Sequence, residues 1–274
     1  MTAGSTMKAK AQSQVPVVPR LPGKIRHALG SATPSIVLVL IILAAWEACV
    51  RILQVPAFVV PAPTDIAAVL AERQAELFQA SLVTGAEILY GFLYSCVVGI
   101  AIALLVDRYA WFGRASYPLI VLFQNVPKIA LAPLLILWFG YDLLPKIALI
   151  VIMAFFPVTL NMLVGLRSAD ANLVALLRSI GATPNQILRQ VKIPASLPAL
   201  MAGMKVAITL SVIGAIVGEF VGASAGLGYM IQFASSQMET ALVFAALVQI
   251  SVLGVFFYYV IELIEHRFLG WATH

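Results

Sequence analysis

Long apolar stretches alternate with short polar ones along this chain of 274 residues. Six of the apolar stretches have roughly the 20 residues that a helix needs to cross the hydrocarbon core of a bilayer. They cover residues 34–53, 82–106, 117–139, 144–166, 199–221 and 241–264. The pattern therefore predicts an all-α fold: a polytopic membrane protein with six transmembrane helices.

Basic residues fall on alternate polar segments. The tail at residues 1–33, the Arg108–Arg114 turn and the loop at 167–192 hold most of them, while the other loops are mainly acidic. Because lysine and arginine are enriched on the cytoplasmic side, we expect both termini and the 167–192 loop to be cytoplasmic. Residues 1–33 are polar and proline-containing, which predicts a mobile tail ahead of a membrane domain at 34–270.

A second polar feature precedes the second apolar stretch. Residues 65–78 carry alanine and leucine on one face, so they predict an amphipathic helix on the external surface.

The longest polar interruption, residues 168–198, predicts a helical hairpin. Its first half is an amphipathic helix, because apolar residues recur at helical spacing. Gly181 follows the last of them, where a helix often ends with a left-handed residue. The apolar positions are Leu173, Val174, Leu176, Leu177 and Ile180.

The second half of this segment has the signals of a new helix. Thr183 can cap it, Pro184 suits its first turn, and Gln186 completes a capping box. Pro194 and Pro198 are predicted to end it. A preorganised hairpin that projects from a membrane domain is suited to being gripped by another protein.

The spacing within this hairpin resembles the EAA loop of ABC importer permeases. That motif reads Glu-Ala-Ala, three residues, Gly, nine residues, Ile, one residue, Leu-Pro. Here Ala175-Leu176-Leu177, Gly181, Val191 and Ile193-Pro194 stand at these positions, with Ala175 in place of the glutamate. By this resemblance the ATPase-coupling residues are Ala175, Leu176, Leu177, Arg178, Gly181, Ala182, Pro184, Ile193 and Pro194.

Three further segments are similar to the nitrate, sulfonate and taurine branch of these permeases: residues 55–66, 125–140 and 218–231. The resemblance implies a type I ABC permease of the bacterial inner membrane, which transports a small solute. It also implies a permease dimer, two ATPase subunits that hold the ATP and Mg²⁺, and an external solute-binding protein. The chain itself would carry no cofactor.

Polar residues inside the apolar stretches are candidates for a translocation path. Gln124, Asn125 and Lys128 cluster with two prolines in the third stretch, which predicts a broken helix beside a water-filled route. Lys128 there would favour an anionic solute. Alternatively, Lys128 extends to the cytosolic interface and anchors the helix. Asn161 and Glu219 are further path candidates, and an interfacial carboxylate is the simpler interpretation of Glu219.

Gly214, Gly218, Gly222 and Gly226 recur every fourth residue. This pattern allows two helices to approach closely, either within the chain or between subunits. We expect Gly226 to lie past the membrane and to tolerate substitution better than the others.

Composition and missing motifs narrow the function. The chain is 62% hydrophobic and 11% charged, with mean hydropathy +1.00, so its net charge of +5 bears on topology and not on nucleic acid. The sequence has no G-x-x-x-x-G-K-[ST] phosphate loop, no metal-binding motif and no nucleophile–base set, which excludes self-powered transport and disfavours a membrane enzyme. A secondary transporter or channel is the alternative function.

Overall fold

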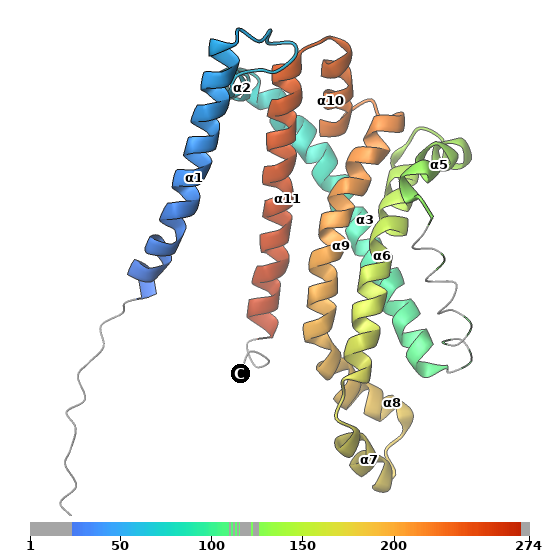
Figure 1. Cartoon of the computed structure of the whole chain (residues 1–274). Coiled ribbons are helices and arrows are strands. Elements are labelled where there is room, and N and C mark those ends of the chain that lie inside the picture. The colour runs from blue at the N-terminus through green and yellow to red at the C-terminus, as the bar shows by residue number, and fades with distance from the viewer. Residues whose placement is uncertain are drawn as a thin grey trace, which may run out of the picture. The chain divides into compact units, whose positions relative to one another are not determined.

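A computed structural model describes residues 24–109, 111, 113, 115, 122 and 126–269. The chain divides into two units, Met1–Cys49 and Val50–His274. The described residues form helices joined by short turns (Figure 1). The helices are α1 (Lys24–Ile52), α2 (Pro63–Glu72), α3 (Gln74–Arg108), η1 (Lys128–Leu131), α5 (Ala132–Phe139), α6 (Leu143–Arg167), α7 (Ala171–Ser179), α8 (Pro184–Ile187), η2 (Leu188–Lys192), α9 (Ile193–Gly222), α10 (Leu227–Ser236) and α11 (Thr240–Phe268).

Helices α3, α6 and α9 form the packed centre of the second unit. Helices α7 and α8 lie at one end of this bundle, which we call the hairpin end, and α5 and α10 lie at the other, which we call the α10 end (Figure 1). Helix α11 packs against α9 and α10.

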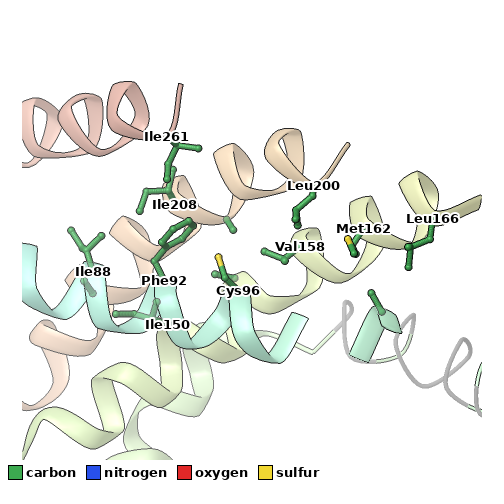
Figure 2. Close-up of a cluster of buried hydrophobic side chains, with 14 residues drawn as sticks. Ile88, Phe92, Cys96, Ile150, Val158, Met162, Leu166, Leu200, Ile208 and Ile261 are labelled. Atoms are coloured by element: carbon green, nitrogen blue, oxygen red, sulfur yellow. The ribbon is translucent and has the colours of Figure 1, made fainter. Parts of the chain in front are cut away.

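The core of the bundle follows from four-residue spacing of apolar side chains. One face of α6 carries Ile150, Ala154, Val158, Met162 and Leu166, all buried (Figure 2). Neighbours on a helix lie three or four positions apart, so these five form a continuous ridge. It packs against Ile88, Phe92 and Cys96 of α3 and against Leu200, Ala207, Ile208 and Ala215 of α9.

Among the residues that the structure describes, four helices are long and apolar enough to cross a membrane: Gln74–Arg108, Leu143–Arg167, Pro184–Gly222 and Thr240–Arg267. The predicted second, fourth, fifth and sixth apolar stretches each lie within one of them, so these predictions are confirmed as helical candidate spans. The stretch at 34–53 falls almost entirely within α1.

The predicted third stretch, residues 117–139, lies only partly within the described residues, and Gln124 and Asn125 lie outside them. The described part contains the short apolar segment Lys128–Phe139, which starts as the 3₁₀-helix η1 and continues as α5. Pro127 precedes it with ψ 87°, outside the helical range.

The helix predicted at 65–78 is instead divided between α2 and α3. The break is at Arg73, whose guanidinium donates to Glu76 at 2.7 Å and to Glu239 at 3.0 Å. The hydrogen bond to Glu76 and the charge of Glu239 raise the pKa of Arg73 above its ordinary value. Because Glu239 is 166 positions away, local periodicity could not reveal this corner.

Candidate functional sites: the coupling hairpin and a buried polar cluster

The hairpin at 168–198 begins with α7, whose ends are fixed by local hydrogen bonds. The Asp170 carboxylate accepts from the backbone N–H of Asn172 at 2.8 Å, which caps the first turn. At the other end, Ala182 N–H donates to Leu177 C=O at 2.9 Å and Gly181 N–H donates to Arg178 C=O at 3.0 Å. This pair of bonds is a Schellman motif.

Gly181 makes that motif possible, because its φ is +84°. An L-residue with a side chain rarely adopts this conformation. Gly181, which was predicted to end the helix in a left-handed conformation, therefore has a backbone geometry that favours glycine.

The second helix of the hairpin, α8, begins with the predicted capping box. Gln186 N–H donates to the Thr183 hydroxyl at 3.4 Å, and Thr183 N–H donates to the Gln186 side chain at 2.7 Å. Pro184 occupies the first turn, where no intrahelical N–H is needed.

The prediction that Pro194 and Pro198 end this helix is wrong. Helix α8 continues through the π-helix η2 into α9, in which Pro194 is in the first turn and Pro198 is internal. Ile193 N–H bonds to Leu188 C=O, five positions back. The longer π-turn lies directly before Pro194, which has no N–H to donate, so the helical path is retained across the proline.

The apolar face of α7 is uncovered. No residue of α7 is buried, and Leu173, Leu176 and Ile180 have exposed fractions of 43%, 58% and 72%. Ala175 and Arg178 are also exposed, whereas Leu177 and Ala182 are half-buried. Exposed apolar surface at this spacing is typical of a helix face that binds a partner.

A salt bridge joins the base of the hairpin to the bundle. Lys192 Nζ lies 2.8 Å from each carboxylate oxygen of Asp107, near the C-terminal end of α3. Beside it is a cavity of about 450 Å³. The charged side chains that line it are Asp107, Arg108, Arg178 and Lys192.

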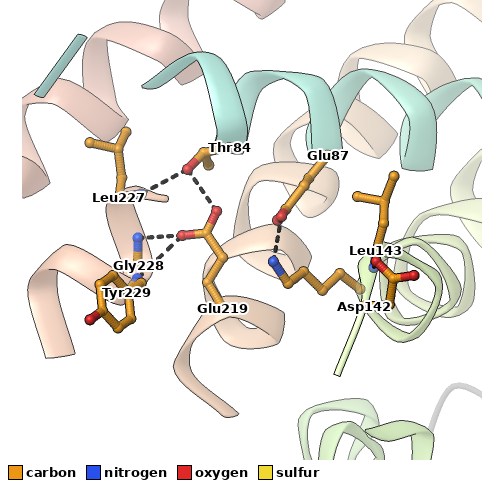
Figure 3. Close-up of polar contacts among 9 residues, drawn as sticks. Thr84, Glu87, Asp142, Leu143, Glu219, Leu227, Gly228 and Tyr229 are labelled. Atoms are coloured by element: carbon orange, nitrogen blue, oxygen red, sulfur yellow. Dashed lines mark hydrogen bonds and ion pairs between the residues drawn. The ribbon is translucent and has the colours of Figure 1, made fainter. Parts of the chain in front are cut away.

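A buried polar cluster lies at the α10 end, where sequence analysis had named only Glu219 (Figure 3). Glu219 is fully buried. Its Oε1 accepts from the Thr84 hydroxyl at 2.7 Å, and its Oε2 accepts from the N–H of Gly228 and, at 3.4 Å, of Tyr229. Thr84 in turn accepts from Leu227 N–H at 2.8 Å. The Glu219 carboxyl group thus lies at the N-terminus of α10, where the helix dipole favours negative charge.

Two glycines make room for this carboxylate. A Cβ at Gly226 would collide with the Glu219 carboxyl group, and Gly226 has φ +111°. A Cβ at Gly228 would lie 2.9 Å from Glu219 Oε2. The expectation that Gly226 tolerates substitution is therefore wrong, since the backbone must approach Glu219 closely there.

Glu87 and Lys146 complete the cluster. Lys146 Nζ lies 2.5 Å from Glu87 Oε1, and the Glu87 residue is only 2% exposed. Glu87 Oε2 has no hydrogen-bond partner among the described residues.

The path candidates that the structure describes lie on different helices. Lys128 is half-buried at the start of η1. Asn161 Nδ2 donates to Pro157 C=O at 2.8 Å, and its side chain lies against Gly203 of α9. Glu219 is enclosed at the α10 end.

The glycines of α9 face other helices of the same chain. A Cβ at Gly214 would lie 3.1 Å from Ile150 Cα, one at Gly218 would lie 3.3 Å from Lys146 Cβ, and one at Gly222 would lie 2.5 Å from Ile136 Cδ1. Tighter contacts with backbone atoms occur elsewhere. A Cβ at Gly165 would lie 2.6 Å from Ser196 Cα, and one at Gly203 would lie 2.7 Å from Pro157 O.

A helical membrane bundle with a projecting, capped hairpin has the architecture of a transport permease. The chain belongs to the family described as the binding-protein-dependent transport system inner membrane component, whose model matches residues 95–270. It is therefore a multi-pass inner-membrane permease subunit of an ABC transporter and not itself an ATPase. Members of this family work with an ATPase and a solute-binding protein.

Two curated relatives span most of the chain. The formylaminopyrimidine transport permease ThiX of Halalkalibacterium halodurans is 36% identical over 233 residues, which cover 85% of this chain and 93% of the relative. The putative aliphatic sulfonates transport permease SsuC of Bacillus subtilis is 32% identical over 278 residues, which cover 97% and 98%.

A solved amino acid ABC transporter has the same fold. Its TM-score is 0.58 at 18% identity, over 72% of this chain and 96% of that one. The fold is thus that of a type I ABC permease.

Proposed function

We propose that this chain forms the translocation path of an ATP-driven importer for a small solute with an anionic group, such as a sulfonate, nitrate or taurine. Six spans place both termini and the hairpin in the cytoplasm. A permease homodimer binds two ATPase subunits on that side and a solute-binding protein on the other. The closing of the ATPases on ATP moves the hairpins, and the spans open outward to accept the solute.

The uncovered face of α7 is the observation that carries this proposal. Leu173, Leu176 and Ile180 present apolar surface beyond the end of the bundle, where the polar and basic surroundings are those of a cytoplasmic loop. Leaving such surface in water costs about 25 cal/mol per Å². A partner that covers it recovers this free energy, and because α8, η2 and α9 are continuous, movement of the partner reaches the spanning helix directly.

The preference for an anion rests on Lys128. This residue opens the short apolar segment Lys128–Phe139, and a cation beside the route lowers the barrier for a negative solute. One curated relative is named for aliphatic sulfonates, which are anions, and another for formylaminopyrimidine. We place Asn161 beside the same route, with Gln124 and Asn125 before it in sequence.

Reconstitution tests the proposal. The chain is co-expressed with its partner ATPase and binding protein, purified, and placed in liposomes with a panel of sulfonates, nitrate and taurine. We expect uptake that needs external binding protein and internal ATP. Uptake by the permease alone, driven by an ion gradient, would instead establish the secondary-transporter alternative.

A further inference from the structure

The buried cluster at the α10 end contains two carboxyl groups and one ammonium group. Helix α3 contributes Glu87 and Thr84, α6 contributes Lys146, and α9 contributes Glu219. Helix α10 contributes its N-terminal N–H groups. Lys146 pairs with Glu87, so one negative charge remains beyond the ion pair.

Glu219 has the hydrogen bonding of an ionised carboxylate. Both of its oxygens accept, from the Thr84 hydroxyl and from two backbone N–H groups. The Thr84 hydroxyl is itself an acceptor for Leu227 N–H, so its single hydrogen is directed at Glu219. Glu219 has little reason to carry a proton in this arrangement.

Unlike Glu219, Glu87 has one carboxyl oxygen that accepts no hydrogen bond from the described residues. Its Oε1 accepts from Lys146, whereas its buried Oε2 accepts from no described group. Glu87 is one helical turn from Thr84 on α3, and Thr84 bonds Glu219, so the two carboxyl groups face the same small space (Figure 3).

We propose that Glu87 and Glu219 share one proton, which Glu87 Oε2 carries and donates to Glu219. The proton turns an orphaned acceptor into a donor and leaves the cluster as one lysine ammonium and one carboxylate. Two facing ionised carboxylates in a buried site would repel each other strongly. A metal ion is a poor substitute, because no group of three His, Cys, Asp or Glu side chains in the described part of the chain could hold one.

The cluster joins four helices at the α10 end. The shared proton links α3 to α9, Lys146 links α3 to α6, and Glu219 links α9 to α10. Loss of the proton would place two negative charges against each other and loosen α3 from α9. This bond system is separate from the proposed solute specificity and from ATPase docking, so it can be tested on its own.

Infrared difference spectroscopy detects the proton directly. The complex in lipid is compared with its Glu87→Gln variant at neutral pH. We expect a carboxylic-acid C=O band in the wild type that shifts in D₂O and is missing from the variant. Glu72→Gln, at an exposed carboxylate on α2, is the control and should retain the band. If the wild type has no band that Glu87→Gln removes, the proposal is wrong.

The pH dependence of stability provides a second measurement. A native state that holds a proton released by the unfolded chain loses stability as pH rises, by about tenfold in the folding equilibrium per pH unit. The unfolding temperature of the wild-type complex should therefore fall between about pH 6 and about pH 9. Gln at position 87 can accept from Lys146 and donate to Glu219, so Glu87→Gln should remain folded and lose this slope.

The two glutamates should respond differently to the same substitution. Glu219→Gln puts an amide donor against backbone N–H donors and removes the anion from the N-terminus of α10, so it should lower the unfolding temperature at every pH. Equal tolerance of both variants, or an unchanged pH slope in Glu87→Gln, would overturn the assignment of the proton to Glu87.

Discussion

The ammonium nitrogen of Lys192 lies 2.8 Å from both carboxylate oxygens of Asp107, although the two residues are 85 positions apart. Lys192 is the last residue of η2, and Asp107 is the next-to-last residue of α3. The pair therefore joins the root of the hairpin to a different spanning helix. Movement of the hairpin has two routes into the bundle, one along α9 and one through this bridge.

We expect Lys192→Gln and Asp107→Asn each to reduce the solute transported per ATP hydrolysed, because the second route is cut. The side chains are 26% and 12% exposed, so we expect a double-mutant coupling energy of about 1 kcal/mol in unfolding experiments. Glu76→Gln, which breaks the more exposed Arg73–Glu76 pair at the other end, is the control. Unchanged transport stoichiometry in both single variants would show that the bridge transmits nothing.

Gly181→Val tests the hinge. A β-branched residue at φ +84° costs about 1–3 kcal/mol, so the hairpin should distort and ATP hydrolysis should uncouple from uptake. Gly140 is a control outside the hairpin, since its φ is +81° and a Cβ at either glycine meets nothing within 4 Å. Its ψ of −171° belongs to a region essentially restricted to glycine, so Gly140→Val should carry at least as large a conformational cost, with coupling intact. Equal coupling in the two variants would remove the hairpin's assigned role.

Glycine-to-alanine variants should rank by the atoms that the new Cβ meets. Gly165→Ala should be the most harmful, costing about 1–3 kcal/mol, because the Cβ lies against the Ser196 backbone, which cannot rotate away. Gly218→Ala should cost less. Gly254→Ala should be nearly neutral, because its nearest atom is 3.8 Å away. The fraction of each variant that stays folded in detergent after heating, measured by fluorescence-detected gel filtration, tests this ranking. The reverse ranking would contradict the prediction.

Lys128 variants test the anionic path. We expect Lys128→Glu to lower uptake at least tenfold, because a negative charge at that position repels the solute, and Lys128→Arg to retain part of it. ATPase binding should be normal in both. A lysine that only anchors the helix at the interface predicts wild-type uptake for Lys128→Gln, and that result would remove the reason to favour an anion.

Cysteine labelling tests the orientation. In a Cys49→Ser/Cys96→Ala background, a membrane-impermeant reagent applied outside should label a cysteine at Glu72 and miss one at Asn185. Both positions are exposed in the structure, so accessibility depends on the side of the membrane. External labelling of Asn185 would reverse the proposed topology.

Local signals in the sequence were enough to predict the end of α7 and the start of α8, although the helix end predicted at Pro194 and Pro198 is wrong. The Schellman turn at Gly181 and the capping box at Thr183 depend on residues within a few positions of each other, and the structure has both. Four of the predicted spans also lie within single long helices, because sustained apolarity is itself a local property.

Features that depend on distant residues were not predictable in the same way. The corner at Arg73 needs Glu239, and the cluster around Glu219 needs Thr84, 135 positions earlier. The sequence pattern at Gly214, Gly218 and Gly222 is easy to recognise because it repeats every fourth residue. Among the described glycines, however, Gly165 is the one whose Cβ would come closest to the backbone of another helix, and Gly165 belongs to no such repeat. Periodicity shows which face of a helix carries small residues, but not which residues pack against that face.

The π-turn at η2 has a mechanical consequence. By keeping the chain helical across Pro194, it makes Pro184–Gly222 a single strut of 39 residues, about 58 Å long at about 1.5 Å per residue. Gly165 of α6 contacts this strut at Ser196, and Glu219 lies 23 residues further along, about 35 Å from that contact. If the helix tilts as a rigid lever about this fulcrum, a tilt of about 5° displaces Glu219 by about 3 Å.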